Sequence, residues 1–264
     1  MRQVVQNLRN GKLDVDDVPA PVLLEGSILV ANHYSLISAG TERATVDLAS
    51  RSLLGKAQAR PDLTRKVVDK LRRDGVVETV RMVNQRLDRR ACLGYSCAGV
   101  VVGVGSAVRG FRPGDRVACA GQNFASHAEL VCVPTNLCTT IPDAVSYADA
   151  AFVAVGAIAL HAVRQCEPRI GETIAVIGLG LVGQLIVQIL KANGCRVVAA
   201  DVDGQRVTLA QQHGAHQAVL PAELVSTCAA RTDGRGCDAV IIAASTVSNE
   251  PVEVAAEVCR QKGR

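Results

Sequence analysis

Two patterns of hydrophobic residues divide this chain into two parts. In the first part, short β-branched runs such as residues 27–32, 98–105 and 128–134 are separated by Gly and Pro, which is typical of strands joined by turns. In the second part, apolar strands alternate with helical segments. The pattern predicts an α/β fold, with a β-barrel-like domain over residues 1–143 and a parallel-sheet domain over residues 144–264.

A segment with helical spacing interrupts the first domain at about residues 43–90. Apolar residues recur every three to four positions on both sides of Gly75, which predicts two amphipathic helices with a break between them. Residues 51–90 carry twelve Lys or Arg and five acidic residues, so they hold the basic excess of a chain whose net charge is +4. This segment is either a solvated helix face or a surface for an anionic substrate, and it does not indicate nucleic-acid binding.

The composition indicates a protein of a reducing compartment. Hydrophobic residues make up 48% of the chain and aromatic residues 2%, which suits buried strands rich in Val, Ala, Leu and Ile. The ten Cys are scattered and no two have C-x-x-C spacing, so we predict free thiols rather than disulfides or a structural zinc. The first residues do not have the pattern of a signal peptide, and no apolar stretch reaches the roughly 20 residues of a spanning helix. We expect a cytoplasmic protein that does not contact membranes.

A glycine-rich turn stands between a strand and a helix of the second domain. The β-branched run at residues 173–177 leads into Gly178-Leu179-Gly180-Leu181-Val182-Gly183 and a helix over residues 184–192. In such turns the first Gly permits the tight bend, the second lets the backbone approach a pyrophosphate, and the third lets helix and strand pack closely. The helix N-terminus adds free N–H groups. We predict that these six residues bind a nicotinamide dinucleotide.

An acidic residue follows the next predicted strand and selects between the two nicotinamide dinucleotides. Asp201 lies 23 residues after Gly178. A carboxylate at about this distance accepts hydrogen bonds from the adenosine ribose and repels a 2′-phosphate. We therefore predict NAD(H) rather than NADP(H).

Four more residues are expected to contact the cofactor. Val202 and Arg206 follow Asp201, although an Arg can also accommodate a 2′-phosphate. Ala244 and Ser245 end a later strand, predicted over residues 238–245, and ligands lie at the carboxyl ends of strands in such sheets.

Several phrases outside residues 43–90 are similar to those of the medium-chain dehydrogenase/reductase superfamily. They are Ile37-Ser38-Ala39-Gly40-Thr41-Glu42, Gly94-Tyr95-Ser96-Cys97-Ala98-Gly99-Val100-Val101, Gly110-Phe111-Arg112-Pro113-Gly114-Asp115-Arg116-Val117 and the glycine turn. The resemblance implies a GroES-like barrel domain followed by a Rossmann domain with a doubly wound parallel sheet. It also implies an oxidoreductase that acts on a small molecule.

Zinc-dependent members of this superfamily place metal ligands at three positions. Here Ser38 and Ala39 stand at the first, Tyr95 at the second, and Ala154 and Val155 at the third. A catalytic zinc needs three converging N, S or carboxylate ligands. The resemblance therefore implies a zinc-independent member without a metal site.

The insertion narrows the resemblance. Together with Lys56-Ala57-Gln58-Ala59-Arg60-Pro61-Asp62-Leu63, it is similar to the N-terminal half of bi-domain oxidoreductases that carry a C-terminal Gfo/Idh/MocA-type domain. That implies sugar or nucleotide-sugar substrates in polysaccharide biosynthesis. A doubly wound sheet continues after its fourth strand, so we expect a truncated fold that lacks the last strands and leaves residues 238–245 as an exposed edge. A second copy or a missing C-terminal domain is the expected partner.

Without a metal, a side chain must polarise the carbonyl or take up the alcohol proton. Tyr95 is the first candidate, because a phenol can donate a hydrogen bond to a carbonyl oxygen. Ser38 and Thr41 can share that role, and Glu42 can orient them. The alternative is that Tyr95 only fills the space of an absent ligand. The weaker candidates are His33, His127 and His161.

The leading hypothesis is a zinc-independent, NAD(H)-dependent oxidoreductase for an alcohol or carbonyl substrate, including substrates derived from sugars. One alternative is an NADPH-dependent quinone or enone reductase. Another is a non-catalytic dinucleotide-binding module attached to a further domain.

Overall fold

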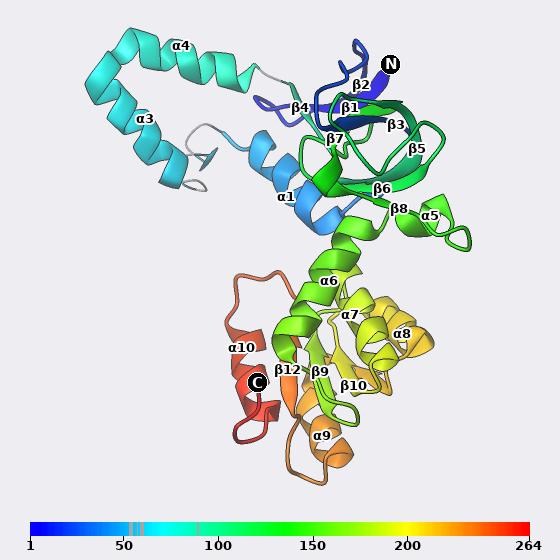
Figure 1. The fold of residues 1–264 in the computed structure, drawn as a ribbon. Helices are drawn as coiled ribbons and strands as arrows, with labels where there is room; N and C mark the ends of the chain where they lie inside the picture. The colour runs from blue at the N-terminus through cyan, green and yellow to red at the C-terminus, as the bar shows by residue number, and fades with distance from the viewer. Residues whose placement is uncertain (53–54, 57, 59–60, 89) are drawn as a thin grey trace. The chain divides into compact units, whose positions relative to one another are not determined.

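The computed structural model describes residues 1–52, 55–56, 58, 61–88 and 90–264, apart from the side chains of Leu63, Val68 and Arg86. It divides into two compact units, Met1–Ala154 and Val155–Arg264 (Figure 1). The division lies inside helix α6 (Val153–Cys166), later in the chain than the boundary expected at residue 143. Each unit has its own hydrophobic core.

The first unit is built on two antiparallel sheets. The smaller has the order β2-β1-β4 and the larger the order β7-β3-β5-β6-β8. Their strands are β1 (Arg2–Asn7), β2 (Leu13–Asp17), β3 (Ser27–Ser35), β4 (Arg90–Cys92), β5 (Ser96–Val104), β6 (Arg116–Ala120), β7 (Leu130–Pro134) and β8 (Cys138–Thr140). A 3-10 turn, η1 (Thr135–Leu137), joins the last two.

The larger sheet encloses a core of small and β-branched side chains. Ile28, Val30, Val101 and Val117 are fully buried there. Gly99 lies where β5 pairs with β3 at an irregularity of the register, and an added Cβ would overlap the carbonyl oxygen of Ala31. These strands form the GroES-like barrel that the sequence predicted.

Helices occur at two places in the chain of this unit, between β3 and β4 and after β8. The insertion contains α1 (Ala39–Ser50), α3 (Pro61–Asp74) and α4 (Val76–Leu87), and Gly75 separates the last two with a positive φ of 82°. This confirms the predicted helix break. Residues 57, 59 and 60 of the phrase that resembles bi-domain oxidoreductases lie outside the described residues. Later in the chain, α5 (Tyr147–Ala150) precedes α6.

The second unit is a four-stranded parallel sheet in its described part, with the order β11-β10-β9-β12. The strands are β9 (Thr173–Ile177), β10 (Arg196–Ala200), β11 (Gln217–Val219) and β12 (Ala239–Ile242). The connecting helices are α7 (Leu181–Ala192), α8 (Gly204–His213), α9 (Pro221–Arg231) and α10 (Glu250–Val258). This is the 3-2-1-4 order of a Rossmann half-sheet, as predicted.

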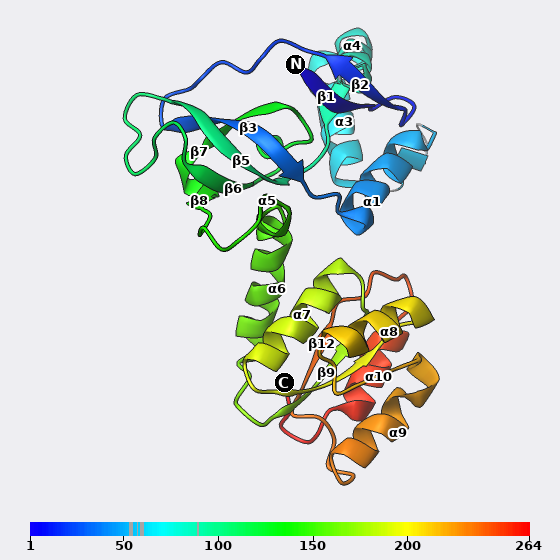
Figure 2. The ribbon, with the colours of Figure 1, turned by 90° about the vertical axis from the view of Figure 1, so that its right-hand side faces the viewer.

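Helices cover both faces of this sheet (Figure 2). Side chains of α6, α7 and α8 pack with Ile174 and Val176 on one face, whereas those of α9 and α10 pack with Ala175 and Ile177 on the other. Residues 174–177 of β9 therefore point alternately to opposite faces and are all apolar, because both faces are covered. No helix in the described ranges is long and apolar enough to cross a membrane.

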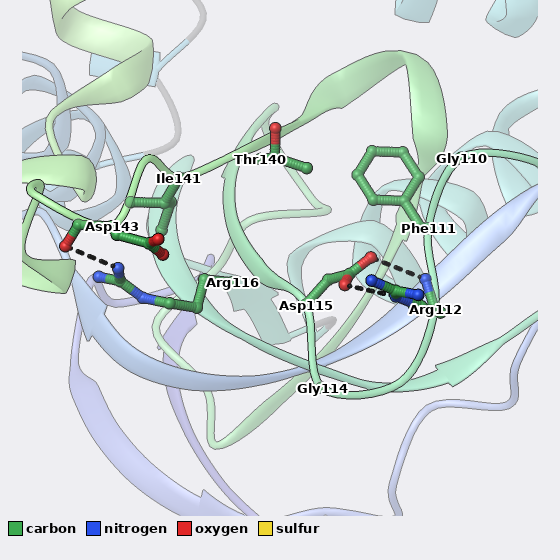
Figure 3. A pocket seen from close by; sticks show the side chains of 9 residues that line it. All are labelled: Gly110, Phe111, Arg112, Gly114, Asp115, Arg116, Thr140, Ile141 and Asp143. Carbon is green, nitrogen blue, oxygen red and sulfur yellow. Dashed lines mark hydrogen bonds and ion pairs between the residues drawn. The ribbon is translucent and has the colours of Figure 1, made fainter.

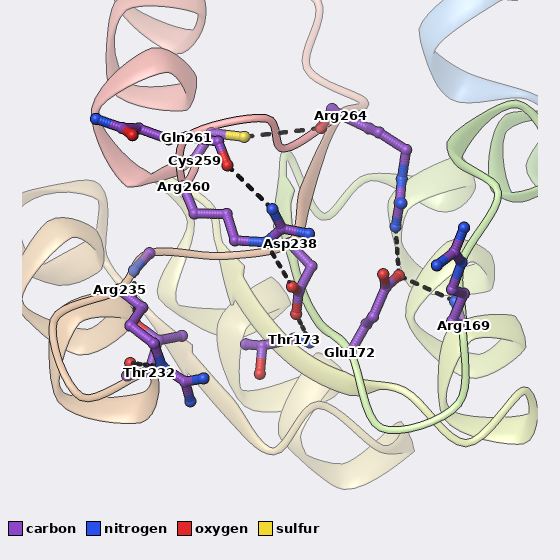
Figure 4. Close-up of polar contacts among 11 residues, drawn as sticks. Arg169, Glu172, Thr173, Thr232, Arg235, Asp238, Cys259, Arg260, Gln261 and Arg264 are labelled. Carbon is purple, nitrogen blue, oxygen red and sulfur yellow. Dashed lines mark hydrogen bonds and ion pairs between the residues drawn. The ribbon is translucent and has the colours of Figure 1, made fainter.

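The edge of β12 corrects one expectation. Backbone after α10 runs back along this strand, where Cys237 N–H donates to Val258 O (2.7 Å) and Val240 N–H donates to Arg264 O (2.8 Å). Two ion pairs reinforce this backbone pairing, one between Arg260 and Asp238 and one between Arg264 and Glu172 (Figure 4). The prediction of an unpaired edge over residues 238–245 was wrong for its first half, because the returning backbone supplies partners there.

Candidate functional site

The glycine turn is shaped by two positions that admit no side chain. Gly178 has a φ of 96°, and an added Cβ would lie 2.6 Å from the nitrogen of Ala244. A Cβ on Gly183 would overlap the carbonyl oxygen of Gly178. By contrast, Gly180 has open space where its Cβ would be. The first and third glycines therefore serve packing, and the second leaves room beside the backbone, as such turns require.

Helix α7 begins directly at the open side of this turn. Gly180 is its N-cap residue, and Leu181, Val182 and Gly183 form the first turn, whose N–H groups have no intrahelical acceptor. They are available to an anion, and the positive end of the helix dipole favours one there. The side chain of Leu179 does not face the cofactor side of the turn, because it is buried in the core.

Asp201 is fixed against the turn by hydrogen bonds to backbone. Its Oδ2 accepts from Leu179 N–H (2.6 Å), and its Oδ1 accepts from Asp203 N–H (2.9 Å). The residue is only 7% exposed. Arg206 lies between two carboxylates, with Nη1 3.6 Å from Asp201 Oδ2 and Nε 3.5 Å from Asp203 Oδ2. The guanidinium charge is therefore already balanced at this site.

Gln184 connects the turn to α8. Its Nε2 donates to the carbonyl oxygens of Leu179 (3.2 Å) and Arg206 (2.9 Å). This link is not predictable from the sequence, because a Gln in the first turn of a helix has many uses. Val202 is 82% exposed beside Asp201, and exposed Ala244 and Ser245 follow β12 next to Gly178.

The structure thus brings the predicted cofactor residues to one edge, at the carboxyl ends of β9, β10 and β12. Free helix N–H groups, a carboxylate held at the neighbouring strand and a glycine without obstruction fit a dinucleotide. Contact of these residues with a cofactor stays a prediction.

The predicted catalytic residues lie in the other unit, at one end of the barrel. Ser38 is buried and precedes α1, whereas Thr41 is exposed in its first turn. Tyr95 is half-buried, and its phenol has no hydrogen-bond partner within the described ranges. Leu36 N–H donates to Ser96 O (2.9 Å), so the segments that carry Ser38 and Tyr95 are neighbours.

Two further residues of the barrel unit, His127 and Ser35, form contacts that the sequence did not predict. The ring of His127 lies between Glu42 and Ser35, with Nε2 3.0 Å from Glu42 Oε2 and Nδ1 2.8 Å from Ser35 Oγ. His127 is among the weaker candidates from the sequence, and Ser35 is not among the predicted residues. Their positions are 92 residues apart, so only the folded barrel places them together.

The residues at the three zinc positions do not fit a zinc ion. The described residues contain no group of three His, Cys, Asp or Glu that could hold a metal. Next to the second position, Ser96 donates to Ala151 O (2.6 Å) and accepts from Ala154 N–H (3.1 Å), so its hydroxyl serves packing. Tyr95, Ala39 and Val155 supply no ordinary zinc ligand.

A hollow of about 700 Å³ on the barrel unit lies apart from these candidates (Figure 3). Its two guanidinium groups are already engaged. Arg112 pairs with Asp115, and Arg116 donates to backbone oxygens including Val145 O (2.5 Å). None of the predicted site residues lines it. It is therefore not the candidate site.

Two protein families match parts of the chain. "Alcohol dehydrogenase GroES-like domain" matches residues 68–143, and "Zinc-binding dehydrogenase" matches residues 182–264. One match lies in each compact unit, in agreement with the barrel and Rossmann topologies.

Curated relatives include named dehydrogenases. An uncharacterised zinc-type alcohol dehydrogenase-like protein of Escherichia coli is 28% identical over 179 residues, which are 56% of this chain and 52% of that protein. The sorbitol dehydrogenase of Bacillus subtilis is 28% identical over 163 residues, 51% of this chain and 46% of its own. The chain spans about half the length of the curated relatives that it matches.

Solved structures show the same fold. An alcohol dehydrogenase from Thermus sp. ATN1 has a TM-score of 0.76 at 21% identity, covering 100% of this chain and 76% of its own. A quinone oxidoreductase of Escherichia coli, solved with NADPH, has a TM-score of 0.73 at 20% identity and covers 100% and 72%. At these identities the likeness concerns the fold alone.

Proposed function

Because this chain belongs to the medium-chain dehydrogenase/reductase superfamily, we propose that it transfers a hydride between NAD(H) and an alcohol or carbonyl compound without zinc. The observation that carries the proposal is Asp201, held by Leu179 N–H at the edge of the glycine turn. The resident cofactor supplies the hydride chemistry. The residues of this chain bind and orient it, and handle the proton.

The charges around Asp201 favour NAD(H) over NADP(H). A 2′-phosphate would bring its negative charge next to a nearly buried carboxylate, and like charges in such a setting repel strongly. Arg206 cannot offset this repulsion, because it already lies within 3.6 Å of Asp201 and 3.5 Å of Asp203. The ribose hydroxyls of NAD(H) can instead donate to the carboxylate.

On the barrel unit, we assign the polarising hydrogen bond to Tyr95. Its half-buried phenol has no partner among the described residues, so its O–H is free to donate to a substrate oxygen. Ser38 and Thr41 are the supporting candidates. No step is assigned to zinc, because the residues at the three ligand positions supply no suitable donor set.

A polyol or sugar-derived alcohol is the proposed substrate class. The support comes from the names of the relatives, which include a sorbitol dehydrogenase, a probable D-xylulose reductase A of Neosartorya fischeri and an L-idonate 5-dehydrogenase of Vitis vinifera. Reduction of quinones or enones with NADPH is the second candidate, and the support for it is the fold shared with quinone oxidoreductases.

Binding of NADH and NADPH to purified protein, measured by calorimetry, tests the cofactor proposal. NADH should bind at least tenfold more tightly than NADPH. Asp201→Asn should weaken the affinity for NADH by about tenfold or more, because a charged hydrogen bond is lost. It should also reduce the ratio between the affinities for NADH and NADPH. Asp233→Asn is the matched control, because its side chain is 91% exposed and its ion pair is with Arg235 rather than with Arg206.

Turnover then separates the candidate functions. Oxidation of a polyol panel with NAD, in metal-free buffer, supports the proposal. Preference for NADPH with quinones would favour the second candidate. Tight NADH binding without any turnover, together with no effect of Tyr95→Phe, would identify a non-catalytic binding module. Stoichiometric zinc in active protein would refute the zinc-independent assignment.

A further inference from the structure

Three side chains of the barrel unit form a continuous chain of hydrogen bonds that the proposed function does not use. Ser35 ends β3, His127 lies in the loop before β7, and Glu42 lies in the first turn of α1. The Ser35 hydroxyl is 2.8 Å from His127 Nδ1, and His127 Nε2 is 3.0 Å from Glu42 Oε2. We call these residues the Ser–His–Glu chain.

The ring of His127 is held rigidly. The side chain is 9% exposed and that of Glu42 is 12% exposed. Backbone bonds fix the loop, since His127 N–H donates to Leu93 O (2.8 Å) and Val4 N–H donates to His127 O (2.9 Å). A Cβ on Gly94 would lie 2.9 Å from the ring. The turn that leads to Tyr95 is therefore packed directly on this imidazole.

Glu42 fixes which ring nitrogen carries the proton. Its second oxygen, Oε1, already accepts from Ser38 N–H (2.9 Å), so the carboxylate is an acceptor in both contacts. Nε2 of His127 must then be the donor. In the neutral ring Nδ1 is unprotonated, and the Ser35 hydroxyl donates to it.

This arrangement leaves one end of the chain open. Ser35 is only half-buried, and its neighbours Tyr34 and Ile37 are 54% and 68% exposed in this unit. With its proton directed at Nδ1, the Ser35 oxygen still has lone pairs that can accept a hydrogen bond from outside. The half-buried Ser35 hydroxyl is therefore the end of the chain that a hydroxyl compound from outside can contact.

We propose that Ser35 takes the proton from the substrate hydroxyl and that His127, oriented by Glu42, stores it. This inference rests on the proposed function. In alcohol oxidation the carbon–hydrogen electron pair leaves as hydride to NAD⁺. The hydroxyl proton passes to Ser35 Oγ as the Ser35 proton passes to His127 Nδ1. The products are the carbonyl compound, NADH and an imidazolium paired with Glu42, and reduction runs the same steps in reverse.

The carboxylate makes storage feasible. A cation at a side chain that is 9% exposed is costly unless it is paired, and Glu42 supplies the partner at 3.0 Å. The elements that hold the ring carry further titratable side chains, namely Arg2, His33, Tyr34, Arg43, Asp47, Arg90, Cys92 and Tyr95. Arg2 pairs with Glu129, Arg43 with Asp47 and Arg90 with Asp16. Glu42 is the one that contacts the ring in the described part of the chain.

Ser35→Ala is the first test, because it removes the open end while leaving the His127–Glu42 pair. We expect kcat to fall by about 100-fold, as for loss of a general acid–base group, with NADH affinity and the unfolding midpoint unchanged. Ser35→Thr should restore most of the rate. Ser50→Ala, which removes a hydroxyl bonded only to Asp47 O in the same helix as Glu42, should leave kcat unchanged.

His127→Gln tests storage, because its amide can still donate to Glu42 but cannot hold the proton. The acidic limb of the pH–kcat profile for oxidation should disappear, a change that a purely structural role would not produce. Nitrogen-15 NMR of labelled histidine should show the proton of neutral His127 on Nε2.

Each failure has its own signature. Turnover by Ser35→Ala at the wild-type rate, or a neutral ring protonated on Nδ1, overturns the Ser–His–Glu chain and leaves the proposed function standing. Wild-type protein that binds NADH but transfers no hydride overturns both.

Discussion

At the residue scale, the glycines of the cofactor turn have separable tasks. Gly183 has no room for a Cβ because the carbonyl oxygen of Gly178 occupies that space. Gly180 has an ordinary φ of −67° and open space around its Cβ position. One glycine therefore serves the fold and the other serves the ligand.

This difference predicts opposite outcomes for two alanine substitutions. Gly183→Ala should lower the unfolding free energy by about 1–3 kcal/mol, the range for overpacking, and should abolish NADH binding because the turn must shift. Gly180→Ala should unfold like the wild type and still lose at least tenfold in NADH affinity. Urea unfolding and calorimetry measure the two effects. Equal NADH affinity of Gly180→Ala and wild type would contradict the placement of the pyrophosphate.

At the element scale, ion pairs join the starts of β9 and β12 to the segment that follows α10 (Figure 4). Asp238 accepts from Arg260 Nε (2.7 Å) and from Thr173 N–H (2.8 Å). Partial burial opposes ionisation, but these two hydrogen bonds outweigh it and hold the pKa of Asp238 below its ordinary 3.8. The ionised carboxylate therefore stabilises the pairing along β12.

The sign of this shift predicts how stability depends on pH. A carboxyl group with a lowered pKa contributes stability above its unfolded pKa and loses it as pH falls through the folded one. Asp238→Asn should cost about 1–2 kcal/mol at neutral pH, by loss of a charged hydrogen bond. The difference in unfolding free energy between Asp238→Asn and wild type should shrink below about pH 4, where the wild-type carboxylate becomes protonated. Urea unfolding across pH measures it.

Asp233→Asn is the control for this experiment. Asp233 is 3.8 Å from Arg235 and its side chain is 91% exposed, so the substitution should change stability little. A constant gap between Asp238→Asn and wild type down to pH 3 would show that the charge of Asp238 is not what stabilises this edge.

At the scale of the whole molecule, both units contain cysteine residues, and their redox state is a property of the entire chain. All ten Cys are free, as the scattered spacing predicted. Burial raises the pKa of the Cys166 and Cys195 thiols, which keeps them protonated and unreactive. Four have intermediate exposure, namely Cys92, Cys132, Cys138 and Cys259.

Thiol titration with a chromogenic disulfide checks this distribution. In native protein at most these four thiols should react within minutes, and ten should react in denaturant. Mass spectrometry of alkylated peptides should find Cys166 and Cys195 modified only after unfolding. Fewer than ten reactive thiols in non-reduced, denatured protein would indicate a disulfide.

The sequence by itself determined the first two strands of the second unit and the glycine turn between them. The apolar runs at residues 173–177 and 196–200 are the observed β9 and β10, because strands buried on both faces have a continuous apolar signature. The turn from Gly178 to Gly183 and the carboxylate of Asp201 were also predictable from the sequence, because their spacing is local and their chemistry depends on residue type.

Tertiary structure alone decided what these residues contact. The bond between Asp201 and Leu179 N–H, the backbone that pairs with β12 and the Ser–His–Glu chain join positions far apart in sequence. Hydrophobic periodicity reports which face of an element is buried, but it carries no information about which distant polar side chain meets which. His127 therefore looked like an ordinary loop histidine until the barrel placed Glu42 and Ser35 against its two nitrogens.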